Sequence, residues 1–183
     1  MKKLFSILAL IGTAAIAPAF AGTITLSAPA TVNGPFDVYV NLSNVFEAPH
    51  EDDFFLAYGF DLTFDNSILS YLGHTPGALF TDISSNPGIG AQVAGVATSI
   101  FLAPGDFVEP LTLAILHFGV VGNGPATIGI TGDPGNLDQG LIYLLGSDPI
   151  STNADVRATV PEPGTTLLLG AGLAVLGLIR KRL

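Results

Sequence analysis

Hydrophobic and polar side chains alternate along two stretches of this chain. In residues 36–43 and again in residues 58–65, the even positions are large and apolar, while the odd positions are polar or small. A period of two is typical of a β-strand with one buried face and one wetter face. The pattern therefore predicts two strands, with Tyr39 on the exposed side of the first and Tyr58 on the core side of the second.

A third stretch, residues 111–121, is apolar at both even and odd positions. This indicates a central strand that is covered on both sides or carries a bulge. Turn signals rich in Gly and Pro punctuate the chain at Asn33-Gly34-Pro35, Thr75-Pro76-Gly77, Asn86-Pro87-Gly88, Asn123-Gly124-Pro125 and Asp133-Pro134-Gly135. Short alternating runs between such turns favour an all-β sandwich.

The N-terminus has a different character. Two lysines follow Met1, residues 4–17 are apolar, and Ala19-Phe20-Ala21 forms a small-x-small site. These are the three parts of a secretory signal peptide. We expect residues 1–21 to be removed by signal peptidase, using Ala19 and Ala21 as the cleavage signal, so that the mature chain begins at Gly22.

The C-terminus carries a second targeting pattern. Pro161-Glu162-Pro163 leads into an apolar run, Thr165 to Ile179, and then into Arg180-Lys181-Arg182. This combination resembles the PEP-CTERM sorting signal of exported proteins in Gram-negative bacteria that make extracellular polysaccharide. The resemblance implies a sorting signal over residues 161–183 and an exosortase-like enzyme that acts at or near its Pro-Glu-Pro triplet.

The apolar run would form a single hydrophobic helix. Its 15 residues span about 22 Å at ~1.5 Å per residue, against about 30 Å of hydrocarbon. Because basic residues stay on the cytoplasmic side, Arg180-Lys181-Arg182 places the preceding chain outside the inner membrane. We expect an inner-membrane intermediate, and then a location at the cell surface or in the extracellular matrix.

Charge separates the exported segment from its ends. Residues 22–160 hold one basic residue, Arg157, and 14 acidic ones, which gives a formal charge of −13. Such an acidic segment opposes nucleic-acid binding, which needs Lys and Arg to neutralise phosphates. It suits a cation or a basic partner. Cysteine is absent from the chain, which excludes thiolate chemistry and Cys-based metal sites.

Three segments of the exported part, residues 38–45, 58–69 and 113–120, resemble successive strands of cohesin-like domains. The most specific is the middle one, where a strand ends in Phe64-Asp65 and a turn returns Leu69 to the core. The resemblance implies a jelly-roll β-sandwich over residues 22–160, related in architecture to carbohydrate-binding modules. It also implies protein contacts, because a cellulosomal cohesin grips a dockerin on one sheet face.

Two acidic groups are candidates for calcium, which prefers carboxylate and carbonyl oxygens in turns. The first comprises Glu47, Glu51, Asp52 and Asp53, and the second comprises Asp133, Asn136 and Asp138. Neither has the spacing of an EF-hand. The alternative for each group is a solvated acidic loop with Asx turns.

Catalytic patterns are weak. His50, His74 and His117 show no pair at metal-ligand spacing, no Gly-x-Ser-x-Gly elbow occurs, and residues 22–160 lack Lys. Two carboxylates could serve a glycosidase, but such clefts also use aromatic platforms and the chain has no Trp. We interpret the protein as non-catalytic, with His74 and His117 in structural roles.

Three functions remain, in this order. The first is a non-catalytic surface or matrix protein whose sandwich contacts another surface protein. The second is a module that binds the exopolysaccharide of the biofilm matrix, for which Tyr39 is the most exposed candidate aromatic. The third is a glycoside hydrolase.

Overall fold

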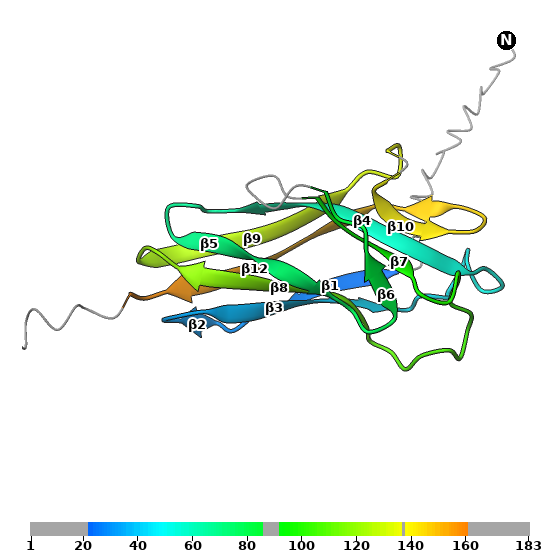
Figure 1. Cartoon of the computed structure of the whole chain (residues 1–183), viewed down its shortest axis with the longest axis horizontal. Coiled ribbons are helices and arrows are strands. Elements are labelled where there is room, and N and C mark those ends of the chain that lie inside the picture. The colour runs from blue at the N-terminus through cyan, green and yellow to red at the C-terminus, as the bar shows by residue number, and fades with distance from the viewer. Residues whose placement is uncertain (1–21, 86–91, 137, 161–183) are drawn as a thin grey trace, which may run out of the picture.

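The computed structural model describes residues 22–85, 92–136 and 138–160, and these form two stacked β-sheets (Figure 1). The strands are β1 (Thr23–Ser27), β2 (Thr31–Val32), β3 (Phe36–Ser43), β4 (Phe55–Phe64), β5 (Leu69–Pro76), β6 (Phe80–Asp82), β7 (Gln92–Ala97), β8 (Leu111–Val120), β9 (Gly124–Gly132), β10 (Gly140–Tyr143), β11 (Ser147–Asp148) and β12 (Ile150–Ala158). The predicted all-β sandwich is confirmed.

One sheet has four antiparallel strands in the order β1-β3-β8-β5. The other follows the order β11-β10-β4-β9-β12-β2, with β7 and β6 added beside β4. Among the strands named above, only the short β2–β12 pair is parallel. We call these the four-stranded sheet and the large sheet.

The core lies between the sheets and is filled by the predicted alternating side chains. Val38, Val40 and Leu42 of β3 are fully buried, and so are Phe60 and Leu62 of β4. The strand predicted at residues 58–65 begins three residues earlier, at Phe55, because Phe55 is also buried and pairs with Leu102. Burying one such aromatic or aliphatic side chain contributes about 1.5–3 kcal/mol.

The position of strand β8 in the sheet explains why it is apolar at both even and odd positions. It lies in the middle of the four-stranded sheet, between β3 and β5, and its register against β3 shifts between Val40 and Asn41. The shift makes Leu113 an extra residue, so Leu113 and Ala114 are both fully buried. The bulge predicted from the apolar run is confirmed, whereas the outer face of β8 is only partly covered.

Two predicted turns are placed differently. Thr75 and Pro76 still belong to β5, where they pair with Ile115 and Ala114, and the chain turns from Gly77 onward. Gly124 likewise opens β9 and pairs with Ala158. In both cases pairing with a long neighbouring strand extends the strand into the turn signal.

The signal peptide predicted at residues 1–21, the helix predicted at residues 165–179 and the turn predicted at residues 86–88 all lie outside the described residues. Within the described ranges, no helix is long and apolar enough to cross a membrane.

Candidate functional site

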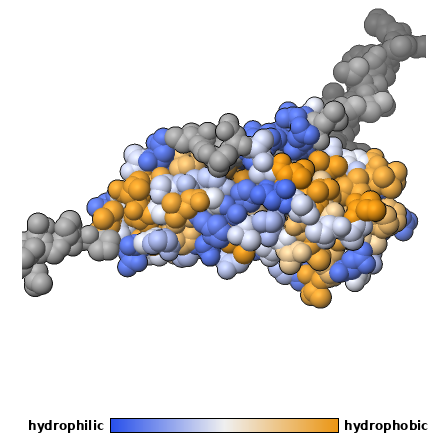
Figure 2. Space-filling view, viewed as in Figure 1, coloured by the Kyte–Doolittle hydropathy of each residue, from blue (hydrophilic) through white to orange (hydrophobic). Residues whose placement is uncertain are grey.

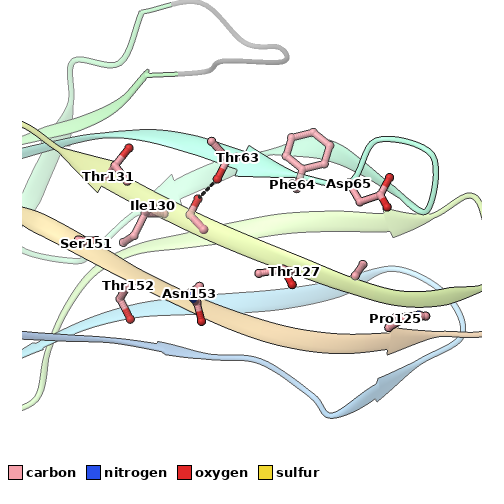
Figure 3. Close-up of a pocket in the computed structure, with 12 residues that line it drawn as sticks. Thr63, Phe64, Asp65, Pro125, Thr127, Ile130, Thr131, Ser151, Thr152 and Asn153 are labelled. Atoms are coloured by element: carbon pink, nitrogen blue, oxygen red, sulfur yellow. Dashed lines mark hydrogen bonds between the residues drawn. The ribbon is translucent and has the colours of Figure 1, made fainter.

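The outer face of the large sheet carries an open trough of about 600 Å³ across β4, β9 and β12 (Figure 3). Sheet register builds it, because Thr63 on β4, Gly129 on β9 and Asn153 on β12 are direct neighbours. A second row places Thr131 beside Ser151. The remaining lining comes from Phe64, Asp65, Pro125, Ala126, Thr127, Ile130 and Thr152.

The hollow exists because Gly129 has no side chain. The Thr63 hydroxyl bends over this residue and donates a hydrogen bond of 3.2 Å to its carbonyl oxygen, drawn as the dashed line in Figure 3. A Cβ at Gly129 would come within 2.8 Å of that hydroxyl oxygen. The sheet therefore dips between the polar side chains of Thr63 and Asn153.

The trough presents hydroxyl, amide and carboxylate groups. Asp65 accepts hydrogen bonds from the hydroxyl and backbone N–H of Ser67, at 2.6 and 2.9 Å, and these bonds lower the pKa of its carboxyl. The Thr127 hydroxyl donates to Asp155 at 2.7 Å. Such a surface can exchange hydrogen bonds with a polar partner, and it resembles the polar part of a protein interface.

Aromatic rings do not form a platform in this trough. Phe64 packs against the core rings of Phe118 and Tyr71, with centroids 5.4 and 6.4 Å away. Tyr39 is 42% exposed, as the sequence predicts, but it lies on the four-stranded sheet. Tyr58 is buried, also as predicted, and burial raises its pKa.

His117 links three strands of the four-stranded sheet. Its Nδ1 lies 2.7 Å from Oδ1 of Asp37 on β3, and its Nε2 lies 2.9 Å from the hydroxyl oxygen of Thr75 on β5. Asp, His and Thr stand in the order of a hydrolase triad here, but they lie on strands whose backbone N–H groups are used in strand pairing. An oxyanion needs preorganised donors beside the nucleophile. The arrangement is explained as a surface hydrogen-bond network.

His74 is also held by neighbours. Its Nδ1 lies 2.9 Å from the Tyr71 hydroxyl, and its Nε2 lies 3.0 Å from the Ser84 hydroxyl and 3.2 Å from Asp82. Burial raises the pKa of Tyr71 to about 12. Hydrogen bonds from Ser84 lower the pKa of Asp82 and outweigh its partial burial. The predicted structural role of His74 fits these contacts.

His50 is buried between two carboxylates, which sequence reasoning missed. Its Nδ1 lies 3.0 Å from Oδ2 of Asp53, and its Nε2 lies 3.5 Å from Oδ1 of Asp148. The Asp53 carboxylate also accepts the backbone N–H groups of Phe54 and Leu145. Burial opposes ionisation of Asp53, but the hydrogen bonds together hold its pKa below the usual value.

The first acidic group is divided by this arrangement. Asp53 is buried and engaged, whereas Glu47, Glu51 and Asp52 are exposed. In the second group, Asp133, Asn136 and Asp138 are all exposed, and Oδ1 of Asp133 accepts the N–H of Gly135 in an Asx turn. Among residues 22–85, 92–136 and 138–160, no three His, Cys, Asp or Glu side chains gather as a metal site.

Two sequence comparisons bear on the chain. The family model of the PEP-CTERM protein-sorting motif matches residues 159–182, which include Pro161, Glu162 and Pro163 and the basic Arg180, Lys181 and Arg182. The motif indicates an exported protein that is anchored transiently in the membrane. No curated protein matches the chain in sequence.

Solved structures show the fold. A cohesin module from a family 33 glycoside hydrolase of Clostridium perfringens matches with a TM-score of 0.58 and 13% identity, over 78% of this chain and 100% of the module. A type II cohesin domain from the cellulosome of Acetivibrio cellulolyticus matches with a TM-score of 0.51 and 14% identity, over 74% and 95% of the two chains. The exported domain thus has the cohesin-like sandwich expected from its sequence.

Proposed function

We propose that this chain is a non-catalytic surface or extracellular-matrix protein of a Gram-negative bacterium, and that its cohesin-like domain binds another protein through the large sheet. Signal peptidase would cut after Ala21, and an exosortase-like enzyme would act near Pro161-Glu162-Pro163. Residues 22–160 would then act outside the inner membrane. The PEP-CTERM match and the sandwich fold support this proposal.

The trough over β4, β9 and β12 is the observation that carries the proposed contact. It is open and extended, and its exposed hydroxyl and amide groups stand on paired strands that hold them in fixed positions. Groups held on rigid strands lose little conformational entropy when a partner binds. The contact would bury this polar face.

A pair of variants tests the face. Thr131→Arg places a long charged side chain in the trough, and Thr25→Arg places the same side chain on β1 of the opposite sheet; both threonines are exposed. The mature protein, cross-linked in the native host, should retain its polypeptide partner in the Thr25 variant and lose it in the Thr131 variant. Equal yields of the partner from both variants would contradict the proposal.

Exopolysaccharide binding is the second candidate, because the same trough is rich in hydroxyl groups and hydroxyl-lined grooves suit sugars. We rank exopolysaccharide binding second because the trough has no aromatic platform, and stacking on aromatic faces contributes much of the binding energy of a sugar. Affinity electrophoresis in the host's purified exopolysaccharide separates the two candidates. The polysaccharide would be favoured if the parent protein is retarded in the gel, Thr131→Arg removes this retardation, and no polypeptide is cross-linked to the parent.

A further inference from the structure

Exposed apolar side chains gather at the end of the sandwich far from the C-terminal end of β12 (Figures 1 and 2). We define the apolar tip as the exposed Ile100, Phe101, Leu144 and Leu145 together with the half-buried Phe54. Ile100 is 79% exposed, Leu145 is 81% exposed and Phe101 is 44% exposed. Contiguous exposed apolar surface of this kind marks interaction sites in soluble proteins.

Backbone pairing brings the tip together from three separate segments. The N–H of Leu144 donates to the carbonyl oxygen of Phe54 at 3.0 Å, so the β10–β11 hairpin lies on one side of residue 54. On the other side, Phe55 and Leu102 exchange backbone hydrogen bonds of 3.0 and 2.8 Å. The rings of Phe54 and Phe101 are in contact, with centroids 4.7 Å apart. The three segments that carry the tip therefore lie side by side.

Ile100 holds an unfavourable backbone conformation. Its φ is +70°, which is an outlier for a β-branched residue because its side chain crowds the backbone there. The turn is fixed by the Ser99 hydroxyl, which donates to the carbonyl oxygen of Phe101 at 2.8 Å. Strain of this kind concentrates at ligand-binding segments. At Ile100 this conformation turns a large apolar side chain toward solvent, where the exposed side chain adds nothing to the stability of the free domain.

The surroundings of the tip are acidic. The segments 44–54, 98–110 and 140–148 contain no Lys or Arg, and they carry exposed carboxylates at Glu47, Glu51, Asp52, Asp106 and Glu109. A second copy of this domain would bring the same charges to the contact, and an anionic lipid surface would be repelled. Charge complementarity instead selects a partner whose apolar side chains are flanked by Lys or Arg.

We propose that the apolar tip is a docking site for a cationic, apolar segment of another protein. This inference rests on the proposed role in protein binding, and it adds a second contact surface and the chemistry of its partner. Apolar side chains of the partner would cover Phe101 and Leu145, while its basic residues would face the surrounding carboxylates. Binding would weaken as salt is added, because the ion pairs lie at the exposed rim.

A synthetic peptide alternating Leu and Lys is a direct probe, and the same peptide with Glu in place of Lys is its control. By fluorescence anisotropy, the mature protein should bind the Lys peptide and not the Glu peptide. The double variant Phe101→Ser/Leu145→Ser should weaken binding at least tenfold. Leu72→Ser on β5 is the matched control, because Leu72 is exposed to a similar extent on the four-stranded sheet, and it should bind like the parent.

Ile100→Asn separates docking from folding. Asn tolerates positive φ, so this variant should melt at or above the parent's temperature and still bind the Lys peptide several-fold more weakly. Equal affinity of the tip variants and the parent would overturn the inference. Loss of peptide binding only in Thr131→Arg would overturn it while leaving the proposed function intact. Binding of the protein to phosphatidylcholine–phosphatidylglycerol vesicles, or self-association without peptide, would also overturn it by showing another occupant.

Discussion

The imidazole of His50 lies flat on the ring of Tyr143, with centroids 3.8 Å apart and planes 5° from parallel. The Tyr143 hydroxyl donates a 3.0 Å hydrogen bond to the carbonyl oxygen of Val45, which ties the start of the loop that contains His50 to β10. The end of this loop is held by the N–H of Leu144, which donates to the carbonyl oxygen of Phe54. Burial raises the pKa of Tyr143, and the nearby carboxylates of Asp148, Asp53 and Glu109 add to this. The stack joins two of the three segments that form the apolar tip.

Asp53 should make the domain sensitive to acid. Its pKa is lowered in the folded state, so its stabilisation is complete above the ordinary value of 3.8 and is lost as pH falls through the lower folded value. Asp53→Asn removes this dependence and takes away one of the two carboxylates beside the buried His50, which should cost about 2–4 kcal/mol at neutral pH. Urea unfolding between pH 2.5 and 7 measures both effects.

The control for that series is Asp52→Asn, which removes an exposed carboxylate one residue away. We expect the Asp52 variant to follow the parent's curve closely. Parallel curves for the parent and the Asp53 variant below pH 4 would contradict the role assigned to Asp53.

Gly59 should tolerate no side chain. It lies in the middle of β4, where a Cβ would be 1.9 Å from the backbone oxygen of Asp138. Because that atom belongs to the backbone, the chain itself would have to shift, and Gly59→Ala should destabilise the domain by about 2 kcal/mol or more. Gly34→Ala is the matched change, since a Cβ there meets nothing within 4 Å. Similar melting temperatures for the two variants would contradict the close packing of β4 at Gly59 against the backbone of Asp138.

Calcium at the second acidic group stays a prediction from sequence, with Asp133 and Asp138 as its exposed carboxylates. A site in the 10⁻⁴–10⁻³ M range of extracellular modules would add about 1–2 kcal/mol at 5 mM calcium. The melting temperature should then rise by a few degrees, and Asp133→Asn/Asp138→Asn should abolish the rise. No heat of binding and no thermal shift in the parent would remove the calcium hypothesis.

The His117 network should be structural. We expect His117→Ala to lower the free energy of unfolding by about 1 kcal/mol through loss of its bonds to Asp37 and Thr75. Hydrolysis of p-nitrophenyl acetate by the parent and by this variant should be the same. A parent activity that disappears in both His117→Ala and Thr75→Ala would identify a catalytic site and overturn the non-catalytic interpretation.

Much of the fold could be predicted because its signals are local. The alternation in residues 36–43 is confirmed as β3, and the apolar run from Leu111 is confirmed as a bulged central strand. The short strands β2, β6 and β11 have too few residues for a periodic signal. Their pairing depends on long neighbouring strands rather than on their own sequence.

The candidate sites could not be predicted in the same way, because each depends on contacts between distant parts of the chain. The trough needs Gly129 to lie between Thr63 and Asn153, and this follows only from the sheet register. Asp148 approaches His50 through the β10–β11 hairpin, although nearly a hundred residues separate the two in sequence. The acidic run at residues 51–53 predicts a cation site, but the fold buries Asp53.

We propose that this domain is exported and sorted through its two targeting ends. Intact mass and cell fractionation of the protein from its native host, with and without the exosortase-like enzyme, test it most directly. We predict a chain that begins at Gly22 and ends near Pro163, found outside the inner membrane only when the enzyme is present. A chain that still ends at Leu183 in the inner membrane of cells containing the enzyme would contradict the account.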